Sequence, residues 1–332
     1  MEPSSRAPLG RTSLTVTRAG LGTAPLGGLY EAVDDETAAV TVERAWRLGI
    51  RFFDTAPLYG HGLSERRLGR SLAGRPRGDF VLATKVGRLL RAGAPPDPSQ
   101  ASGAVERWQG VPPVNPVFDF SYDGVLRSVE ESLERLGVDR VDVLHIHDPD
   151  EHYAEALAGA YPALDRLRSE GTIGAVGVGM NQSELLVRFA READFDCFLI
   201  AGRYTLLDQS ALAELLPLCL ERGIAVVVGG VYNSGILADP GAKAFFDYSV
   251  APPRLIERAQ RLRDVCARHR VPLKAAAIQF PLAHPAVTSL LVGPRSVAEL
   301  EENLALLRAD IPPALWDELR AERLLARDAP TP

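Results

Sequence analysis

The chain has 332 residues, of which 46% are hydrophobic and 24% are charged, and it carries a formal net charge of −6. This length and composition indicate a soluble globular protein that can bury a large hydrophobic core. The acidic balance argues against a basic surface of the kind that binds nucleic acid or an anionic membrane, so we expect neither as a partner.

Two further features narrow the class of protein. The three cysteines, Cys197, Cys219 and Cys266, lie far apart and lack the spacing of metal ligands, so we expect neither a disulfide framework nor a metal site. No run of about 18 apolar residues follows the charged N-terminal segment or occurs later in the chain. We therefore expect a cytoplasmic protein.

Short apolar runs alternate with amphipathic stretches, which is typical of repeated βα units on a parallel sheet. The apolar runs predict eight strands at residues 19–24, 52–54, 80–85, 141–147, 175–178, 197–200, 225–228 and 289–292. Helical periodicity predicts helices at 36–48, 63–72, 122–136, 153–169, 183–191, 209–221, 253–269, 273–282 and 296–306. Eight repeats without a change in composition favour a closed (β/α)8 TIM barrel over an open sheet. We expect one such α/β domain over residues 1–332, with an N-terminal β-hairpin and an extra C-terminal helix at 314–325.

The Pro- and Gly-rich segment 91–116 separates the third strand from its helix and is longer than an ordinary βα loop. A loop of this kind at the C-terminal end of a strand can act as a lid over a functional site. The alternative is a disordered insertion.

Three of the predicted strands end in an ionisable residue. These residues are Asp54, Lys85 and His147, and Tyr59 follows the first of them by five positions. Side chains at the C-terminal ends of barrel strands point into the active site of such a fold. A carboxylate, an ammonium, an imidazole and a phenol therefore meet at one rim, which predicts a site for proton transfer.

The chemistry of these groups suggests a division of roles. Tyr59 is a poor base near pH 7 because the pKa of a free phenol is about 10, and Lys85 can supply the cation that favours the phenolate. Asp54 would hold Lys85 and keep it protonated, while His147 would orient the substrate oxygen. Each side chain alone also has a structural interpretation, such as a turn cap or a solvated strand end. His145 lies one layer deeper, and we interpret it as a hydrogen-bonded core histidine.

The chain resembles the aldo-keto reductase superfamily over nearly its whole length, from about Leu14 to Leu325. The matching segments, in order, are Phe53-Asp54-Thr55-Ala56 with Tyr59-Gly60, Ala83-Thr84-Lys85, Ile146-His147-Asp148-Pro149 and Leu300-Glu301-Glu302-Asn303. This resemblance implies that Tyr59 is the catalytic acid/base and that Lys85, Asp54 and His147 complete a tetrad. The roles agree with those suggested by the chemistry of the residues.

A Rossmann-type G-x-G-x-x-G fingerprint is absent, because Pro25 stands where the third glycine belongs. The resemblance nevertheless implies a nicotinamide cofactor across the barrel mouth, held by the segments 229–237 and 293–296. Gly-rich turns and a helix N-terminus offer backbone N–H groups to phosphate oxygens. The residues expected to contact the cofactor are Gly22, Thr23, Asn181, Gly230, Asn233, Ser234, Gly235, Leu237, Gly293, Arg295, Glu299, Glu302 and Asn303.

Three positions bear on the choice of cofactor. Gly293 and Glu299 stand where NADP-selective relatives carry Lys and Arg, and a glutamate there would repel a 2′-phosphate by on the order of 1 kcal/mol. This favours NAD. Arg295 could bind a phosphate bidentately, so NADP stays possible. The chain also departs from the family pattern at residues 229–230, where a Gly-Gly pair replaces the Tyr-Ser pair that supports the nicotinamide in many relatives.

Longer motifs narrow the resemblance to the branch of D-threo-aldose 1-dehydrogenase, L-fucose dehydrogenase and pyridoxal 4-dehydrogenase. They are residues 22–30, 120–124, 147–150, 177–182 and 232–235. This branch implies that Tyr59 removes the anomeric proton of an aldose such as L-fucose while C1 passes a hydride to NAD, giving a lactone. The alternatives are a general NADPH-dependent aldehyde or ketone reductase, a pyridoxal dehydrogenase and, more remotely, a non-catalytic cofactor-binding regulatory subunit.

Overall fold

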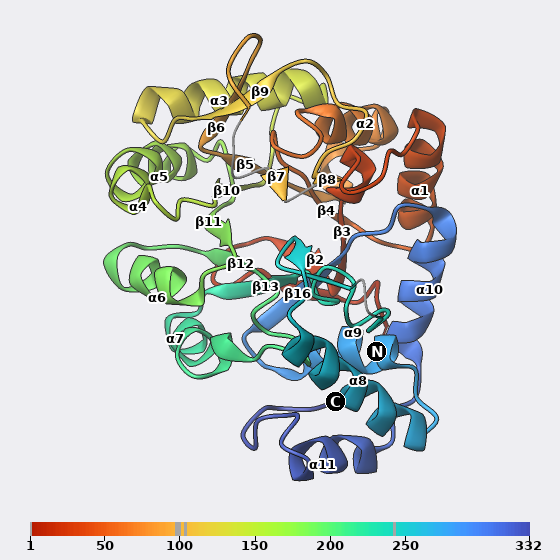
Figure 1. Cartoon of the computed structure of the whole chain (residues 1–332). Coiled ribbons are helices and arrows are strands. Elements are labelled where there is room, and N and C mark those ends of the chain that lie inside the picture. The colour runs from red at the N-terminus through yellow and green to blue at the C-terminus, as the bar shows by residue number, and fades with distance from the viewer. Residues whose placement is uncertain (1, 97–100, 103–104, 242–243) are drawn as a thin grey trace.

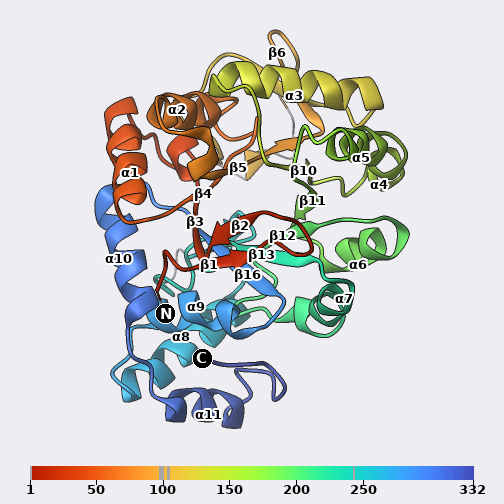
Figure 2. The same ribbon diagram turned by 180° about the vertical axis from the view of Figure 1, so that it is seen from behind.

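Eight parallel strands close into a barrel, and helices surround it (Figures 1 and 2). The structure is a computed structural model that describes residues 2–96, 101–102, 105–241 and 244–332. The barrel strands are β3 (Ala19–Gly22), β4 (Phe52–Asp54), β5 (Val81–Val86), β10 (Val143–His147), β11 (Ala175–Met180), β12 (Cys197–Ala201), β13 (Ala225–Gly229) and β16 (Val287–Val292). Each strand pairs with the next in this order, and β16 returns to β3. The predicted (β/α)8 fold is confirmed, and all eight strands overlap their predicted ranges.

The helices also follow the predicted order. Their bounds are α1 (Asp35–Arg47), α2 (Leu63–Leu72), α3 (Tyr122–Leu136), α4 (Tyr153–Glu155), α5 (Tyr161–Ser169), α6 (Ser183–Glu192), α7 (Leu215–Arg222), α8 (Pro253–Arg268), α9 (Leu273–Gln279), α10 (Val297–Arg308) and α11 (Pro313–Ala321). The extra C-terminal helix α11 packs against α8 outside the barrel. Within the described chain, every helix is too short or too polar to be a membrane span.

The helix α3 shows how local sequence sets an element. Ser121 accepts a hydrogen bond from the Gly124 N–H at 3.1 Å and so caps the start of the helix. Gly137, with a φ of 65°, ends it in the left-handed conformation that glycine adopts readily.

The predicted helix 153–169 is instead a composite of α4, a π-helical turn at Ala156–Ala160 and α5. The Tyr161 N–H donates to the carbonyl of Ala156, five residues earlier. Pro162, the second residue of α5, lacks the N–H that a regular α-helix needs, and the wider turn precedes it.

Side chains on the barrel strands alternate between the barrel interior and the layer of helices. Phe52, Val81 and Ala83 belong to the interior cluster, whereas Phe53 and Leu82 pack toward the helices. Asp54 follows Phe52 by two residues, Lys85 follows Ala83 by two and His147 follows Val143 by four. The three ionisable side chains therefore continue the inward rows at the C-terminal end of the barrel, which brings them together.

An N-terminal β-hairpin covers the opposite end of the barrel (Figure 2). Its strands β1 (Arg6–Pro8) and β2 (Thr15–Thr17) pair antiparallel, as predicted. Leu9 and Val16 are fully buried and join the interior cluster with Phe52, so the hairpin fills the floor of the barrel.

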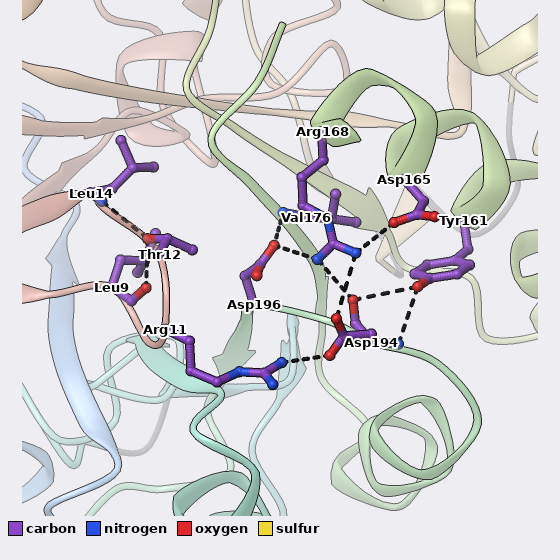
Figure 3. A network of polar contacts seen from close by, with 10 residues as sticks. All are labelled: Leu9, Arg11, Thr12, Leu14, Tyr161, Asp165, Arg168, Val176, Asp194 and Asp196. Carbon is purple, nitrogen blue, oxygen red and sulfur yellow. Dashed lines mark hydrogen bonds and ion pairs between the residues drawn. The ribbon is translucent and has the colours of Figure 1, made fainter. Parts of the chain in front are cut away.

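Charged residues tie this hairpin to the barrel wall, as Figure 3 shows. Arg11, in the hairpin turn, pairs with Asp194 at 2.5 Å. The neighbouring Asp196 is buried, and its carboxylate accepts hydrogen bonds from the Val176 N–H and from Arg168, both at 2.8 Å. Asp196 thus satisfies a backbone donor at the start of β11 while it neutralises the guanidinium of α5.

Replacement of Asp196 by alanine should lower the free energy of unfolding by about 2–3 kcal/mol, because a buried N–H and Arg168 both lose an acceptor. The matched control is Asp194→Ala, whose side chain is 65% exposed and whose loss should cost less than about 1 kcal/mol. Urea unfolding followed by far-UV circular dichroism measures both values. Equal losses in the two variants would contradict the role given to Asp196.

Candidate functional site

Two cavities adjoin at the C-terminal end of the barrel. The smaller has a volume of about 460 Å³ and the larger about 670 Å³. Both are lined in part by Tyr59, Leu199, Ala201 and Tyr248. The phenol predicted as acid/base therefore stands where the two cavities meet.

Asp54 and Lys85 form a buried ion pair beside this junction. Lys85 Nζ lies 2.6 Å from Asp54 Oδ1 and also donates to the Thr55 carbonyl at 2.9 Å. Both side chains are about 1% exposed. Burial raises the pKa of the Asp54 carboxyl, and the positive charge of Lys85 opposes this effect. Lys85 Nζ lies 4.6 Å from the centre of the Tyr59 ring.

The buried hydroxyl groups of Thr23, Thr55 and Ser64 hold the backbone around this ion pair. Ser64 donates to Thr23 Oγ1 at 2.7 Å and lies 3.0 Å from the Thr55 hydroxyl. Thr23 in turn donates to the backbone carbonyl of Asp54 at 2.9 Å. These bonds fix the backbone that carries the Asp54 carboxylate and the Thr55 carbonyl.

Tyr59 lies in the turn after β4, with its ring packed edge-on against His147 at a centroid distance of 5.7 Å. Burial raises its pKa well above 10, and the charges of Asp54 and Asp148 raise it further. Lys85 Nζ lies beside the Tyr59 ring, as the sequence predicts, and is also paired with Asp54. The proposal that Lys85 favours the phenolate stays a prediction.

His147 is 6% exposed at the end of β10, with Nε2 at 3.5 Å from Asp148 Oδ2. Burial, together with the positive charges of Arg88 and Lys85, lowers its pKa well below 6.5. The imidazole is therefore neutral near pH 7 and able to donate one N–H.

His145 lies one layer deeper and is fully buried, as expected. The expected hydrogen bond is wrong, because neither ring nitrogen has a partner within the described part of the chain. Gly177 makes room for the ring, since a Cβ at that position would lie 2.4 Å from His145 Nδ1. Burial and Lys85 lower the pKa of His145 to about 3.

Most of the residues expected to contact a cofactor line the larger cavity. They are Gly22, Gly230, Ser234, Gly235, Gly293, Arg295, Glu299, Glu302 and Asn303. Asn181 lines the smaller cavity instead, where its side chain donates to the Ala201 carbonyl at 3.0 Å.

Thr23, Asn233 and Leu237 line neither cavity, and each is at most 3% exposed, so their contacts with a cofactor stay predictions. Thr23 bonds to the backbone of Asp54, as described above. The Asn233 side chain accepts from the Thr205 hydroxyl at 2.6 Å and donates to the Gly202 carbonyl at 2.9 Å. The polar groups of Thr23 and Asn233 therefore form hydrogen bonds within the protein and stabilise the loops that form the cavity wall.

Ion pairs gather at the end of the larger cavity next to α10. Arg295 pairs with Glu299 at 2.8 Å and also with Glu31, and Lys274 pairs with Glu302. Each of the two cations is thus already matched by at least one carboxylate. The Tyr232 hydroxyl donates to the Asn303 side-chain carbonyl at 2.8 Å and orients that amide.

Three loops meet over the junction and add residues that the sequence did not single out. Tyr248 forms the tip of a hairpin between β14 (Phe245–Phe246) and β15 (Ser249–Val250), with a φ of 62°. Arg107 lies 4.4 Å from the centre of the Tyr248 ring, and Tyr30 packs against that ring from the loop after β3. The hairpin has no glycine in its turn, so the usual sequence signal of a two-residue turn is absent.

The predicted lid, residues 91–116, supplies some of the residues that cover the junction of the two cavities. It begins within the pairing of β6 (Arg88–Arg91) with β9 (Asn115–Phe118). Trp108 lines the smaller cavity, packs against Tyr59 at 5.8 Å and bridges to Leu29. The short strands β7 (Ala101–Ser102) and β8 (Val105–Glu106) also belong to this segment, whereas residues 97–100 and 103–104 lie outside the described residues.

The aldo/keto reductase family model matches residues 18–322 of the chain. The chain is 45% identical to pyridoxal 4-dehydrogenase of Microbacterium luteolum, covering 98% of this chain and 99% of that protein. It is 43% identical to D-threo-aldose 1-dehydrogenase of Pseudomonas sp., covering 100% and 99%. The solved holo form of aldo-keto reductase AKR11C1 from Bacillus halodurans matches with a TM-score of 0.76 at 25% identity, covering 97% and 96%. The chain belongs to the aldo/keto reductase family and is an NAD(P)-dependent oxidoreductase.

The lowered pKa values of His145 and His147 predict that neither imidazole titrates between about pH 5 and 8. NMR of the ring protons over this range checks the prediction, and the variants His145→Gln and His147→Gln assign the signals. The unfolded chain protonates both rings near pH 6.5, so their burial makes the fold less stable as the pH falls from about 6.5 toward 3. A midpoint near 6.5 for either folded ring would contradict the inferred burial.

Proposed function

We propose that this protein oxidises an aldose of the L-fucose or D-threo type at C1 to the lactone, with NAD as the hydride acceptor. The observation that carries the proposal is the position of Tyr59, at the junction of a large cavity and a smaller polar cavity and beside the Lys85–Asp54 ion pair. The similarity to D-threo-aldose 1-dehydrogenase supports it.

The lining of the smaller cavity supports a substrate with several hydroxyl groups. Arg88, Asp148, Asp150 and Gln182 all face this space. Carboxylates and amides accept or donate hydrogen bonds to hydroxyl groups, and a simple apolar aldehyde would leave their remaining hydrogen-bonding capacity unused.

In this proposal Tyr59 exchanges a proton with the substrate oxygen. For oxidation Tyr59 first releases its own proton to solvent; the substrate O–H proton then passes to the Tyr59 oxygen, C1 loses its hydrogen as hydride, and a carbonyl forms at C1, so that one proton is released in each turnover. A bound nicotinamide supplies the acceptor of that hydride. The neutral His147 holds the substrate oxygen through its N–H, and Lys85 with Asp54 fixes the position of the phenol.

The larger cavity has the features that a dinucleotide needs. Gly230 and Gly235 have φ angles of 61° and 102° and no side chain, so backbone groups and free space in the cavity wall are available to phosphate oxygens. Ser234 adds a hydroxyl group to the same wall. We assign Asn181 to the carboxamide group. Tyr248, which lines both cavities, would support the nicotinamide ring in place of the aromatic residue that 229–230 lack.

Glu302 and Asn303 are assigned to the adenine end of the cofactor, next to Arg295. The charges there favour NAD over NADP. Arg295 is held by Glu299 and Glu31, so its guanidinium is not free to bind a 2′-phosphate, and both carboxylates would repel that group.

A second candidate substrate is pyridoxal, because the 45% identical relative is a pyridoxal 4-dehydrogenase. Trp108, Phe118 and Tyr248 line the smaller cavity and could stack on a pyridine ring. Initial rates of nicotinamide reduction with L-fucose, other aldoses and pyridoxal, each with NAD and NADP, discriminate the two functions. Turnover of pyridoxal alone, or reduction of simple aldehydes with NADPH alone, would reject the proposed aldose dehydrogenase.

We expect Tyr59→Phe to lower kcat by about 100-fold or more, because the variant lacks the hydroxyl that transfers the proton. Binding of the reduced cofactor, followed by its fluorescence, should stay within about threefold of the wild type, since the ring is retained. An unchanged kcat would remove Tyr59 from the mechanism.

We expect Glu299→Gln to raise the ratio of kcat/KM with NADP to that with NAD by about tenfold, because it removes one negative charge and one of the two carboxylates that pair with Arg295. Glu301→Gln is the matched control on the same helix, since Glu301 pairs with Arg44 on α1 and lines neither cavity. An equal change in both variants would mean that net charge, and not the contact with Arg295, sets the preference.

A further inference from the structure

Asp148 has an unusual backbone for a residue with a side chain. It follows His147 directly and has a φ of 42°, in the left-handed region that few residues other than glycine adopt. Its N–H donates to the Gly179 carbonyl at 2.9 Å, so the pairing of β10 with β11 continues through this residue. The turn brings the carboxylate back beside the imidazole, with Oδ2 at 3.5 Å from His147 Nε2.

Arg88 holds this carboxylate in place. Its guanidinium lies 3.3 Å from Asp148 Oδ2 and 3.4 Å from the His147 carbonyl. The Arg88 side chain is 4% exposed and stacks over the Phe118 ring at 4.5 Å. An arginine that is buried, stacked and bonded on two sides fixes its partner more firmly than a mobile surface cation does.

The Asp148 side chain nevertheless keeps 31% of its surface accessible, on the wall of the smaller cavity. By contrast, the Asp54 side chain is only 1% exposed and is used by Lys85. Asp148 therefore presents an oriented acceptor to the substrate, and the Arg88 contact leaves lone pairs on its two oxygens for a hydroxyl group.

We propose that Asp148 accepts a hydrogen bond from the hydroxyl group on the carbon next to the reacting carbon, and so makes the enzyme selective for aldoses with a 2-hydroxyl group. This inference rests on the proposed function, in which the reacting oxygen binds at Tyr59 and His147 Nε2. Oxygens on neighbouring sugar carbons are separated by close to the length of one hydrogen bond. Asp148 Oδ2, beside Nε2, is placed to meet the second of them.

The test compares kcat/KM for L-fucose and 2-deoxy-L-fucose with NAD. A site built around a hydroxyl group discriminates against the analogue that lacks it, because the carboxylate is left without its partner. The wild type should prefer L-fucose by about 10- to 100-fold. Asp148→Gly, which suits the left-handed backbone, should bring the ratio close to one by slowing L-fucose oxidation much more than oxidation of the 2-deoxy sugar.

Asp148→Asn keeps the size of the side chain and tolerates the same backbone, and it should give an intermediate ratio because a neutral amide is a weaker acceptor. Asp139→Asn, an exposed change of equal charge before β10, is the control and should leave both sugars unaffected. Circular dichroism and cofactor fluorescence establish that the variants are folded and bind the nucleotide.

Three outcomes overturn the inference. Equal efficiency of the wild type with both sugars rejects the 2-hydroxyl contact and leaves the proposed aldose oxidation standing. An equal loss for both sugars in Asp148→Gly shows that Asp148 only maintains the backbone or the imidazole. Failure of the wild type to oxidise either sugar rejects the proposed function and this inference together.

Discussion

The buried ion pair between Lys85 and Asp54 is the interaction on which the rest of the site depends. Each charge alone would be costly in a pocket that excludes water, and each is tolerated because the other lies within 2.6 Å. The Thr55 carbonyl and the hydroxyls of Thr23 and Ser64 complete its surroundings. Burial and the nearby carboxylates of Asp54 and Asp148 raise the pKa of Tyr59, which lies beside this ion pair.

The two cavities differ in the residues that line them. The larger has glycine turns and paired charges in its lining, and the smaller combines carboxylates, an arginine and aromatic rings; these are the features on which the proposed cofactor and sugar sites rest. Tyr59 and Tyr248 line both cavities; Tyr59 lies in the turn after β4, and Tyr248 lies at the tip of the β14–β15 hairpin. In the proposed function, the hydride would pass where these two cavities adjoin.

Much of the fold and the convergence of four polar groups could be predicted from the sequence, because a strand repeats every two residues and a parallel barrel aligns its strand ends. Asp54, Lys85 and His147 follow inward rows that start at apolar residues. The loops could not be predicted in this way, and Tyr248 and Arg107 reach the site only through tertiary contacts. The sequence also does not show how deeply a polar side chain is buried, and burial raises the pKa of Tyr59 and encloses Thr23 and Asn233. It likewise leaves the His145 ring without the expected hydrogen bond among the described residues.

The pairing of β16 with β3 joins segments that are separated by almost the whole length of the chain. During synthesis on the ribosome, residues 19–22 must wait with an unpaired edge until residues 287–292 have emerged. Until then the incomplete barrel has open strand edges that other chains could pair with. Its completion depends on the pairing of β16 with β3, which are far apart in the sequence. The closure that makes the mature wall continuous therefore has to follow the synthesis of the last barrel strand.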